Sequence, residues 1–454
     1  MTPTGADVIV VGAGPAGAAT AIWLARAGHD VLLLDRARFP RAKPCGDCLS
    51  AAAGALLLRL GVLAEVEAAA PARLAGWRIH APAGHFFEGA FPREGAAAPP
   101  PAGALALPRE RLDAVLAGAA ARAGARLLEG VRVLDVRAAG GGRDGGAAVV
   151  VSPAPGARTV RLRARLVVGA DGLRSVVARR LGLIRREPRL RKLSLTAHVR
   201  GVSWPPGAAG DGPAPAAALA GEPAPGGVAR GEMHLADGAC AGLAPVAAGP
   251  DPLWNLTVVV DAGRFGAQVA ADPAGFFRAT LARFPALRER VHELRFLPHA
   301  HGRRLLASGP FDWATRAVVA PGAALVGDAA GYYDPFTGQG IYQALASAEL
   351  LAQEADDALR GRARAGARTH APLHGYARRR ARLLRGARAL QHLIEAVLAR
   401  PMLADAALAR LRQSRAAADA LIAVTGDLRR AGSLLDPRLL FSLLAPGAPA
   451  EVTE

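Results

Sequence analysis

The feature that most constrains the fold is the hexapeptide GAGPAG at residues 12–17, which joins a short apolar run to a helical pattern. Val8–Val11 has the length and composition of a buried parallel strand. Ala16–Arg26 has helical spacing, and Val31–Leu34 is a second apolar run of strand length. The first 35 residues therefore predict a complete βαβ unit.

A GxGxxG turn between a strand and a helix is typical of dinucleotide binding. One glycine makes the tight turn, one lets the backbone approach a pyrophosphate, and one allows the helix to pack on the strand. The pyrophosphate would lie at the helix N-terminus, where free N–H groups favour anions. Asp35 ends the second strand, eighteen residues after Gly17, where a carboxylate can accept a ribose hydroxyl. The alternative, a glycine-rich turn without a ligand, is disfavoured because all four features agree.

Composition limits the class of protein. The chain has 454 residues, 51% of them hydrophobic, enough for two or three domains. Its net charge of +18 suggests a nucleic-acid partner, but Lys43 and Lys192 are the only lysines and no nucleic-acid motif is present. We therefore expect no nucleic-acid partner. Three cysteines suit a reducing compartment, and no apolar stretch reaches the ~18 residues of a membrane span, so a cytoplasmic location is predicted.

The next part of the chain is predicted to contain both helices and strands. We predict a helix near residues 51–60, a hairpin in GWRIHAPAGHFFEGAF, and a helix followed by a strand from LPRERLD onward. GGGRDGG is predicted as a hairpin loop, and TVRLRARLVVGADGLRSVVARRLGL as a strand, a turn and a helix.

Between Arg191 and about Ala262 the pattern is β-rich, with Pro205–Gly227 predicted as a long mobile surface loop. PAGFFRATLARFPALRERV is predicted as one helix, and RAVVAPGAALVGDAAG as buried strand. Beyond Gln339 the chain is predicted to be helical almost to its end, with breaks at Pro372, Pro401 and Pro437.

Two later motifs accompany the first. VVGADGLRSVVARRLG contains Asp171-Gly172, and ALVGDAAGYYDPFTGQGI contains Gly327-Asp328. Together with residues 12–17 they resemble the flavoprotein superfamily of para-hydroxybenzoate hydroxylase, which includes the geranylgeranyl reductases and flavin-dependent halogenases. The resemblance implies an α/β fold. It has a Rossmann-like FAD-binding domain of the GR2 type (1–75, 101–185 and 302–360), an inserted β-rich substrate domain (76–100 and 186–301) and a C-terminal helical region (361–454).

The resemblance also implies residue roles. Asp35 would bind the adenosine ribose, Asp328 the ribityl and pyrophosphate side, and Arg109 of LPRERLD the FAD. The cofactor-binding residues predicted in this way are Gly12, Gly14, Pro15, Ala16, Gly17, Asp35, Arg36, Cys45, Gly46, Asp47, Arg109, Val133, Asp171, Gly172, Gly327, Asp328, Pro335, Gly338, Gln339, Gly340 and Ile341. NADH or NADPH would be a transient electron donor, since the chain has no second GxGxxG unit. No metal site is predicted.

DPFTGQG at residues 334–340 precedes a helix, so its N–H groups would lie at a helix N-terminus. In a flavin site of this family they would face the pyrimidine edge of the ring and stabilise the negative charge of reduced flavin. Pro335 pre-sets this turn, and Cys45 and Pro335 are the predicted catalytic residues. The alternative is a capped turn without a ligand.

RAKPCGDCLS resembles the Pro-Cys-Gly stretch of geranylgeranyl reductases, which lies beside the flavin. Cys45 and Cys48 also form a CxxC, so a thiol–disulfide role is an alternative. GLAP at residues 242–245 replaces the aromatic-Pro motif of relatives, which disfavours a typical halogenase or reductase. A halogenase would also need a tunnel lysine, for which neither Lys43 nor Lys192 is well placed.

A pair of histidines and a basic helix are two further candidate sites. His299 and His301 in PHAHG would share one face of a strand and could bind a metal, but a surface or hinge position is favoured because no third ligand is apparent. Tyr376–Gln391 is a basic helix that could contact an anionic membrane or an acidic carrier, although a solvated face is favoured.

These patterns support one main function and two alternatives. The main prediction is an FAD-dependent monooxygenase acting through a flavin C4a-hydroperoxide on an apolar or aromatic small molecule. The first alternative is a C=C reductase of the geranylgeranyl reductase type. The second is a non-catalytic flavin-binding partner; a halogenase is ranked lower still. The substrate could be hydrophobic or carrier-bound, and a separate flavin reductase and a peripheral membrane contact stay open.

Overall fold

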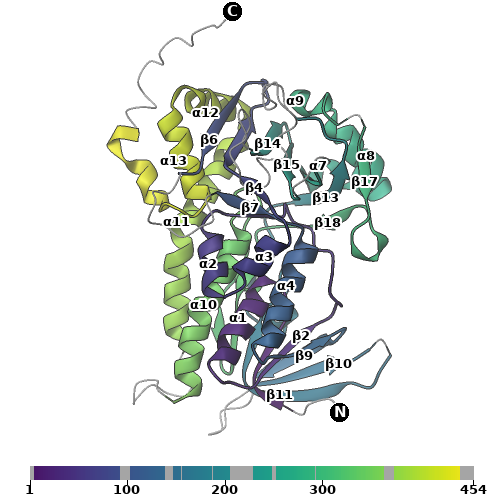
Figure 1. Cartoon of the computed structure of the whole chain (residues 1–454), viewed down its shortest axis with the longest axis vertical. Coiled ribbons are helices and arrows are strands. Elements are labelled where there is room, and N and C mark those ends of the chain that lie inside the picture. The colour runs from purple at the N-terminus through teal and green to yellow at the C-terminus, as the bar shows by residue number, and fades with distance from the viewer. Residues whose placement is uncertain are drawn as a thin grey trace, which may run out of the picture.

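The computed structural model describes residues 5–92, 103–138, 147–154, 156–186, 188–204, 229–247, 252–291, 293–361 and 373–439. Figure 1 shows two sheets stacked along the long axis of the molecule, with helices of the C-terminal part running beside both. The lower sheet starts from the N-terminus, and the upper sheet is built mainly from the middle of the chain.

The lower sheet follows the order β20-β21-β11-β1-β2-β8. Strands β1, β2, β8, β11 and β21 pair in parallel, as a βαβ start requires. Strands β9 and β10 form an antiparallel hairpin attached to β11. The strands are β1 (Gly5–Val11), β2 (Val31–Asp35), β8 (Arg126–Glu129), β9 (Arg132–Ala138), β10 (Ala147–Ser152), β11 (Val160–Gly169), β20 (Val319–Ala320) and β21 (Ala323–Leu325).

Both faces of this sheet are buried, which explains why its central strands are continuous apolar runs. Val8 and Val10 of β1 pack on helices α1, α4 and α10, whereas Ile9 and Val11 pack toward the β9–β10 hairpin and α5. The helices of this part are α1 (Pro15–Arg26), α2 (Ala53–Arg59), α3 (Leu63–Ala68), α4 (Arg109–Arg122), α5 (Val176–Arg180) and α10 (Gly340–Leu359).

The upper sheet has the order β17-β13-β16-β15-β14-β5-β6, with β18 paired to β13. Its strands are β5 (Gly76–His80), β6 (Phe86–Ala90), β13 (Lys192–Arg200), β14 (Gly231–Ala236), β15 (Ala239–Pro245), β16 (Trp254–Asp261), β17 (Arg295–Leu297) and β18 (Leu306–Ser308). Short helices cover its outer face: α7 (Ala262–Ala271), α8 (Pro273–Leu281) and α9 (Pro285–Arg288).

Alternation along these strands separates an apolar face from a mixed one. Leu195, Ala197 and Val199 of β13 join the core under α7–α9. The intervening Ser194 and Thr196 point to the opposite face, which lines a cavity between the two sheets. The upper sheet is therefore the roof of that cavity.

Smaller elements connect the two parts. Strands β3 (Cys48–Leu49), β7 (Ala104–Ala106) and β4 (Ala72–Leu74) form a small sheet, and β12 (Ile184–Arg186) pairs with β19 (Ala314–Thr315). The chain ends in α11 (His374–Leu398), α12 (Pro401–Gln413) and α13 (Arg415–Thr425). Helices α12 and α13 pack on β6, joining the apolar cluster of the upper sheet.

Several predictions of local structure are confirmed and some are wrong. The hairpin at 76–90 and the helix within 51–60 are present. The predicted helix after Pro273 is two helices, because Pro285 starts a new one at its N1 position. LPRERLD is followed by two strands rather than one.

The residues GGGRDGG and Pro205–Gly227 lie outside the described part of the chain, as does Pro372. Pro401 begins α12, and a further break falls at Ser414, which caps α13. Among the described helices, none combines the length and apolarity needed to span a bilayer.

Candidate functional site

A cavity of about 1380 Å³ lies between the two sheets and extends along the carboxyl ends of β1 and β2. This is the edge at which doubly wound sheets bind nucleotides. Most residues predicted for the cofactor line it: Gly12, Gly14, Pro15, Ala16, Asp35, Arg36, Cys45, Gly46, Arg109, Val133, Asp171, Gly172, Asp328, Pro335, Gly338, Gly340 and Ile341. Gly17, Asp47, Gly327 and Gln339 do not line it.

The turn at residues 12–17 has the geometry that its sequence predicts. Gly12 has a φ of 99°, and a Cβ on Gly17 would lie 1.8 Å from the Gly12 carbonyl oxygen. Gly12 therefore makes the tight turn, and Gly17 allows α1 to pack on the strand. A Cβ on Gly14 would meet nothing closer than Arg41 Nη2 at 3.5 Å, so Gly14 leaves open space in the cavity. Helix α1 starts at Pro15 without a side-chain cap, which leaves its N-terminal N–H groups available.

Asp35 holds this turn in place as well as facing the cavity. Its Oδ2 accepts from the Ala13 N–H at 2.9 Å, and its Oδ1 accepts from the Ala37 N–H at 2.9 Å. Arg41 reaches the same carboxylate at 3.4 Å and Asp113 at 3.1 Å. The acid predicted to bind ribose is thus pre-oriented by backbone donors on both sides.

Three cationic side chains line the cavity in front of α1: Arg41, Lys43 and Arg109. Burial lowers the pKa of Lys43, Asp328 opposes this, and the neighbouring guanidinium groups of Arg109 and Arg41 lower it further. Arg109 is buried but forms a bidentate pair with Asp113, at 2.8 and 2.9 Å, which raises its pKa. Two guanidinium groups and an ammonium group beside a helix N-terminus are the donors that suit a pyrophosphate. The sequence did not single out Arg41 or Lys43 as ligands.

Asp328 lies on the floor of the cavity, in the 3-10 helix η2 (Gly327–Ala330). Burial raises its pKa, while Lys43 is the main group that opposes the shift. Gly327 is behind it, since a Cβ there would lie 2.8 Å from the Ala16 Cβ. Asp171 lines the cavity and also holds the start of α5, whose N-cap is Ser175, by accepting from the Val176 N–H at 2.6 Å.

The loop at residues 43–47 forms one side wall. Asp47 is buried behind the cavity, where it accepts from the Arg109 N–H at 3.1 Å and from Asn255 Nδ2 at 2.7 Å. His198 also contacts it at 2.6 Å. Asn255 Nδ2 donates in addition to the Cys45 carbonyl oxygen at 2.7 Å. The loop is therefore fixed by the roof strands β13 and β16.

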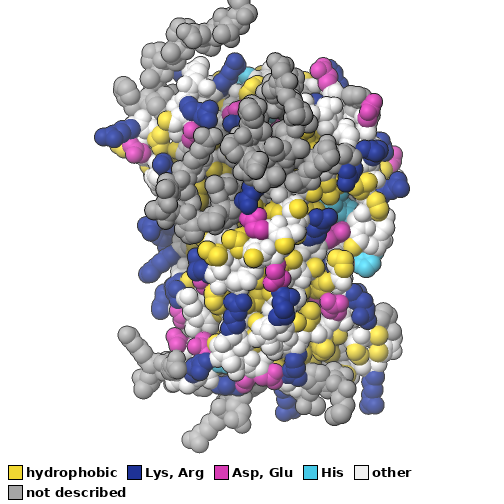
Figure 2. Space-filling view, in the orientation of Figure 1, with side chains coloured by type: hydrophobic (Ala, Val, Ile, Leu, Met, Phe, Trp, Pro, Cys, Tyr) yellow, Lys and Arg dark blue, Asp and Glu magenta, His cyan; other side chains and the backbone are white. Residues whose placement is uncertain are grey.

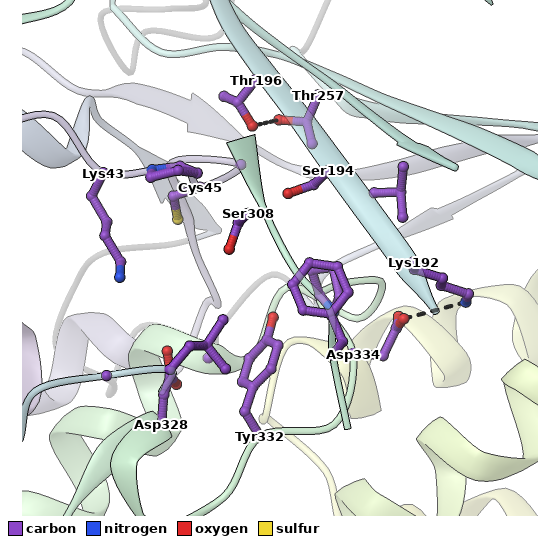
Figure 3. Close-up of a pocket in the computed structure, with 18 of the residues that line it drawn as sticks. Lys43, Cys45, Lys192, Ser194, Thr196, Thr257, Ser308, Asp328, Tyr332 and Asp334 are labelled. Carbon is purple, nitrogen blue, oxygen red and sulfur yellow. Dashed lines mark hydrogen bonds and ion pairs between the residues drawn. The ribbon is translucent and has the colours of Figure 1, made fainter. Parts of the chain in front are cut away.

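Cys45 projects into the cavity from this loop (Figure 3). Burial raises the pKa of its thiol, with Arg109 opposing the shift. Burial also raises the pKa of Cys48 well above its usual value. Both thiols are free and favour the protonated form, which disfavours the thiol–disulfide alternative because the thiolate is the reactive species.

Hydroxyl groups from the roof face the floor across the cavity. Figure 3 shows Ser194, Thr196, Thr257 and Ser308 above Tyr332, with Lys43 and Cys45 to one side. Thr196 and Thr257 share a hydrogen bond of 2.9 Å, and Thr257 donates to Asn255 Oδ1 at 2.9 Å. These residues were missed from the sequence, because a strand's register decides which of its side chains face inward.

The turn at residues 332–340 forms the opposite wall. Gly338 has a φ of 68° and open space where a Cβ would point. Asp334 accepts from the Phe336 N–H at 2.8 Å and pairs with Lys192 at 3.3 Å. The side chain of Gln339 turns away from the cavity and donates to Asp427 Oδ1 at 2.6 Å. The side chain of Gln339 therefore anchors the turn from behind, and only the backbone of Gln339 contributes to the turn.

Lys192, which the sequence did not place at a tunnel, is the first residue of β13 and lines the cavity. Burial opposes its charge, but Asp334 and Glu395 raise its pKa. It also forms an ion pair with Glu395 at 2.5 Å. Its charge is thus neutralised by two carboxylates.

The cavity continues from the roof hydroxyls into an apolar arm. Its walls here are Trp77, Met233, Leu235, Phe336, Leu398 and Ala404. These side chains come from β5, β14, the 332–340 turn and the junction of α11 with α12. A molecule with a polar head and an apolar extension would match this division of the walls.

The predicted arrangement of His299 and His301 on a strand is wrong. His299 precedes a 3-10 turn and is buried against His198, with ring centroids 4.3 Å apart, whereas His301 is exposed with a φ of 68°. Within the described ranges, the group that could offer three ligand atoms is His80, Glu232 and His234. Arg290 binds both Glu232 oxygens, at 2.6 and 2.9 Å. The two imidazoles stack at 7°, and their Nε2 atoms lie 3.6 and 3.2 Å from the same Glu232 oxygen, so that carboxylate is already shared by Arg290 and both histidines.

Comparison with known proteins agrees with this site. Residues 5–386 match the family model described as "FAD binding domain", so the chain belongs to this family of FAD-binding proteins, which includes para-hydroxybenzoate hydroxylase. The protein is an FAD-dependent oxidoreductase by this membership. The predicted superfamily and α/β fold class are confirmed.

Several individual members of the family are similar to this chain. The chain is 33% identical to a menaquinone reductase of Mycolicibacterium smegmatis over 351 residues, 77% of this chain and 76% of the relative. It is 28% identical to a digeranylgeranylglycerophospholipid reductase of Methanothrix thermoacetophila over 78% of each chain. Among solved structures, a myxobacterial chondrochloren halogenase superposes with a TM-score of 0.71 at 23% identity, covering 87% of this chain and 82% of that one.

Proposed function

We propose that this oxidoreductase reduces a C=C bond in a lipid with a polar head and an isoprenoid chain, taking electrons from NADH or NADPH. The observation that carries the proposal is the position of the Cys45 thiol on the cavity wall, where burial raises its pKa. Adding hydrogen to a C=C bond needs a hydride and a proton, and a neutral acid beside the bound substrate can hold that proton.

The cofactor would supply the hydride when bound, and the residues of the chain would bind the cofactor and supply the proton. Arg41, Lys43 and Arg109 would hold its pyrophosphate, and Asp35 its ribose. The N–H groups of the 332–340 turn would face its ring. Oxidation of NADH or NADPH provides one hydride, which is two electrons and one proton, and solvent restores the proton of the Cys45 thiol after each turnover.

The substrate class follows from the walls of the cavity. Ser194, Thr196, Thr257 and Ser308 can hydrogen-bond a polar head. The apolar arm can bury a prenyl chain. Two relatives named above act, by their names, on menaquinone and on a digeranylgeranyl glycerophospholipid, which supports a substrate of this kind. The absent aromatic-Pro motif means that this chain shapes its arm with other residues, such as Trp77 and Phe336.

The test is anaerobic turnover of the FAD-loaded protein with NADH or NADPH and menaquinone. After the quinone ring has been reoxidised, we expect a product heavier by two hydrogens in its isoprenoid chain, with no need for oxygen. The monooxygenase reaction predicted from the sequence would instead give an oxygenated product and consume oxygen in step with the substrate, and that result would overturn the proposal.

The role of Cys45 is tested with Cys45→Ser. We expect kcat to fall about 100-fold, because a serine hydroxyl is a much weaker acid, with FAD content unchanged. Cys48→Ser is the matched control, since Cys48 lies three residues further on in β3, is half-buried as Cys45 is, and lines the same cavity. Equal losses in the two variants would assign the effect to loop packing and remove Cys45 from the reaction.

A further inference from the structure

The junction of α11 with α12 exposes large apolar side chains to solvent. Met402 is 86% exposed, Leu393 61% and Leu403 53%. These three belong to the few large hydrophobic side chains that the described part of the chain leaves outside its cores. We define them as the apolar corner. Scattered apolar residues need no explanation, but three around one helix junction form a patch.

The apolar corner adjoins the catalytic cavity. Leu398, Ala399, Pro401 and Ala404 line the cavity, and Ala399 and Pro401 are also exposed. Met402 and Leu403 lie between Pro401 and Ala404 in the first turn of α12 and point outward. The same helix junction is therefore a wall of the apolar arm on its inner side and the apolar corner on its outer side.

A line of arginines leads to the corner. At 100° per residue, Arg378, Arg382 and Arg385 of α11 lie on the same side of the helix as Leu393, and Arg400 follows at its end. All four arginines are exposed. Figure 2 shows Lys and Arg side chains along the edge of the molecule that α11 occupies in Figure 1. No Asp or Glu shares this line in the sequence.

We propose that the apolar corner and the arginine line of α11 dock the protein on the surface of an anionic phospholipid bilayer. Exposed Leu and Met beside arginines match the two layers of a membrane interface, where apolar groups enter the acyl boundary and guanidinium groups meet phosphate. An acidic carrier protein would account for the arginines but not for the apolar corner. Docking in this way would face the apolar arm toward the phase in which a prenyl lipid is dissolved.

The direct test is co-sedimentation of the full chain, loaded with FAD, with phospholipid vesicles. One set contains phosphatidylcholine alone and the other contains added phosphatidylglycerol. We expect binding to the anionic vesicles, weakened by salt. The double variant Met402→Glu and Leu403→Glu should lower the partition coefficient by about tenfold or more, since it replaces two insertable side chains by charges. Failure of the native protein to bind anionic vesicles would overturn the proposal.

Leu58→Glu is the matched control, because Leu58 is an exposed leucine, 47% accessible, on a different helix, α2. Equal loss of binding in the control and the double variant would overturn the proposed location. A dimer in solution that the double variant dissociates, with no vesicle binding, would assign the corner to a second copy of the chain and would also overturn it. FAD content and the unfolding midpoint identify any variant that fails to fold.

The membrane-docking proposal depends on the proposed function in one respect: the statement that a prenyl lipid enters the apolar arm from the bilayer. Met402 and Leu403 do not line the cavity, so the double variant should reduce the prenyl C=C bond of a short-chain, water-soluble prenylquinone at the native rate. With menaquinone dissolved in anionic vesicles, its rate should fall in proportion to binding. Vesicle binding without reduction of any isoprenoid substrate would support the docking surface. The same result would refute the proposed function.

Discussion

Two glycine-rich turns face the same cavity, yet they are held in place in different ways. The turn at residues 12–17 is fixed by its own neighbourhood: the Gly12 N–H donates to the Leu34 carbonyl at 2.7 Å, and the Ala13 N–H donates to Asp35 at 2.9 Å. All of these partners belong to the first 35 residues. The conformation of this turn is therefore determined by one short stretch of sequence.

The turn at residues 332–340 is fixed from outside. Gln391 of α11 donates to Thr337 Oγ1 at 2.8 Å, and Gln339 donates to Asp427 after α13 at 2.6 Å. Lys192 of the roof joins Asp334 of the turn to Glu395 of α11. The C-terminal helices therefore position a turn of the cavity wall that we propose faces the flavin ring. Glycine makes close approach possible in both turns, but only the second depends on distant side chains.

The largest effect should come from the self-contained turn, through Gly17→Ala. A Cβ at Gly17 would lie 1.8 Å from the Gly12 carbonyl oxygen, a backbone atom that cannot move without opening α1 from β1. We expect the free energy of unfolding of the FAD-free protein to fall by about 3 kcal/mol or more. Chemical denaturation of the FAD-free variant measures this.

Gly14→Ala is the matched control within the same turn. A Cβ at Gly14 has open space in the protein, with Arg41 Nη2 nearest at 3.5 Å, but it projects into the cavity. We expect unchanged stability without cofactor and an FAD affinity lowered about tenfold or more, because the backbone can no longer approach the pyrophosphate. Equal destabilisation of both variants without FAD would refute the separate tasks assigned to the two glycines.

The same contrast explains what the sequence could predict. Residues 12–17 and Asp35 were found because strand, turn, helix and acid follow one another and each constrains the next. The loop at 43–47 was found through its resemblance to geranylgeranyl reductases. Its buried Asp47 was predicted to bind cofactor, but the structure places it behind the cavity, against His198 and Asn255, residues more than 150 positions away.

What the sequence could not predict depends on contacts between distant segments. Gln339 was predicted as a cofactor residue, but its side chain binds Asp427, 88 positions later. The hydroxyls of Ser194, Thr196 and Thr257 were missed because strand register sets the inward face. The fold class needed only local patterns, whereas the polar roof and the fixing of the 332–340 turn required the tertiary structure.

A smaller effect should come from Asp427, the external anchor of the second turn. Burial raises its pKa to about 7, with hydrogen bonds from Ser50 and Gln339 opposing the shift. The unfolded chain loses this proton near pH 4 and the folded protein near pH 7, so the folded state binds more protons between them. Stability from this group is therefore full below about pH 4 and is lost as the pH rises to about 7.

Asp427→Asn removes the titration while keeping an oxygen that can accept from Gln339. The native protein should lose about 2 to 4 kcal/mol more than the variant between pH 4 and pH 7. Urea denaturation of both proteins across this range measures the difference, which cancels other titrating groups. Parallel pH profiles would show that Asp427 is ionised in the folded protein and would remove it as a neutral anchor.

The smallest effect should come from Gln391, whose single hydrogen bond joins α11 to the second turn. Gln391→Ala removes the donor to Thr337 Oγ1, which we expect to cost about 1 kcal/mol. A merely structural bond would change only the unfolding free energy. If α11 positions the turn, the variant should also shift the midpoint potential of bound FAD, because the N–H groups facing the ring move with the turn.

A double-mutant cycle with Thr337→Ala separates these readings, since either single variant breaks the same bond. We expect the two potential shifts to be equal and non-additive, because the N–H groups respond to one shared contact. Additive shifts would mean that Thr337 acts on the turn by itself. The 332–340 turn would then be as self-contained as residues 12–17, and the contrast between the two turns would fail at this bond.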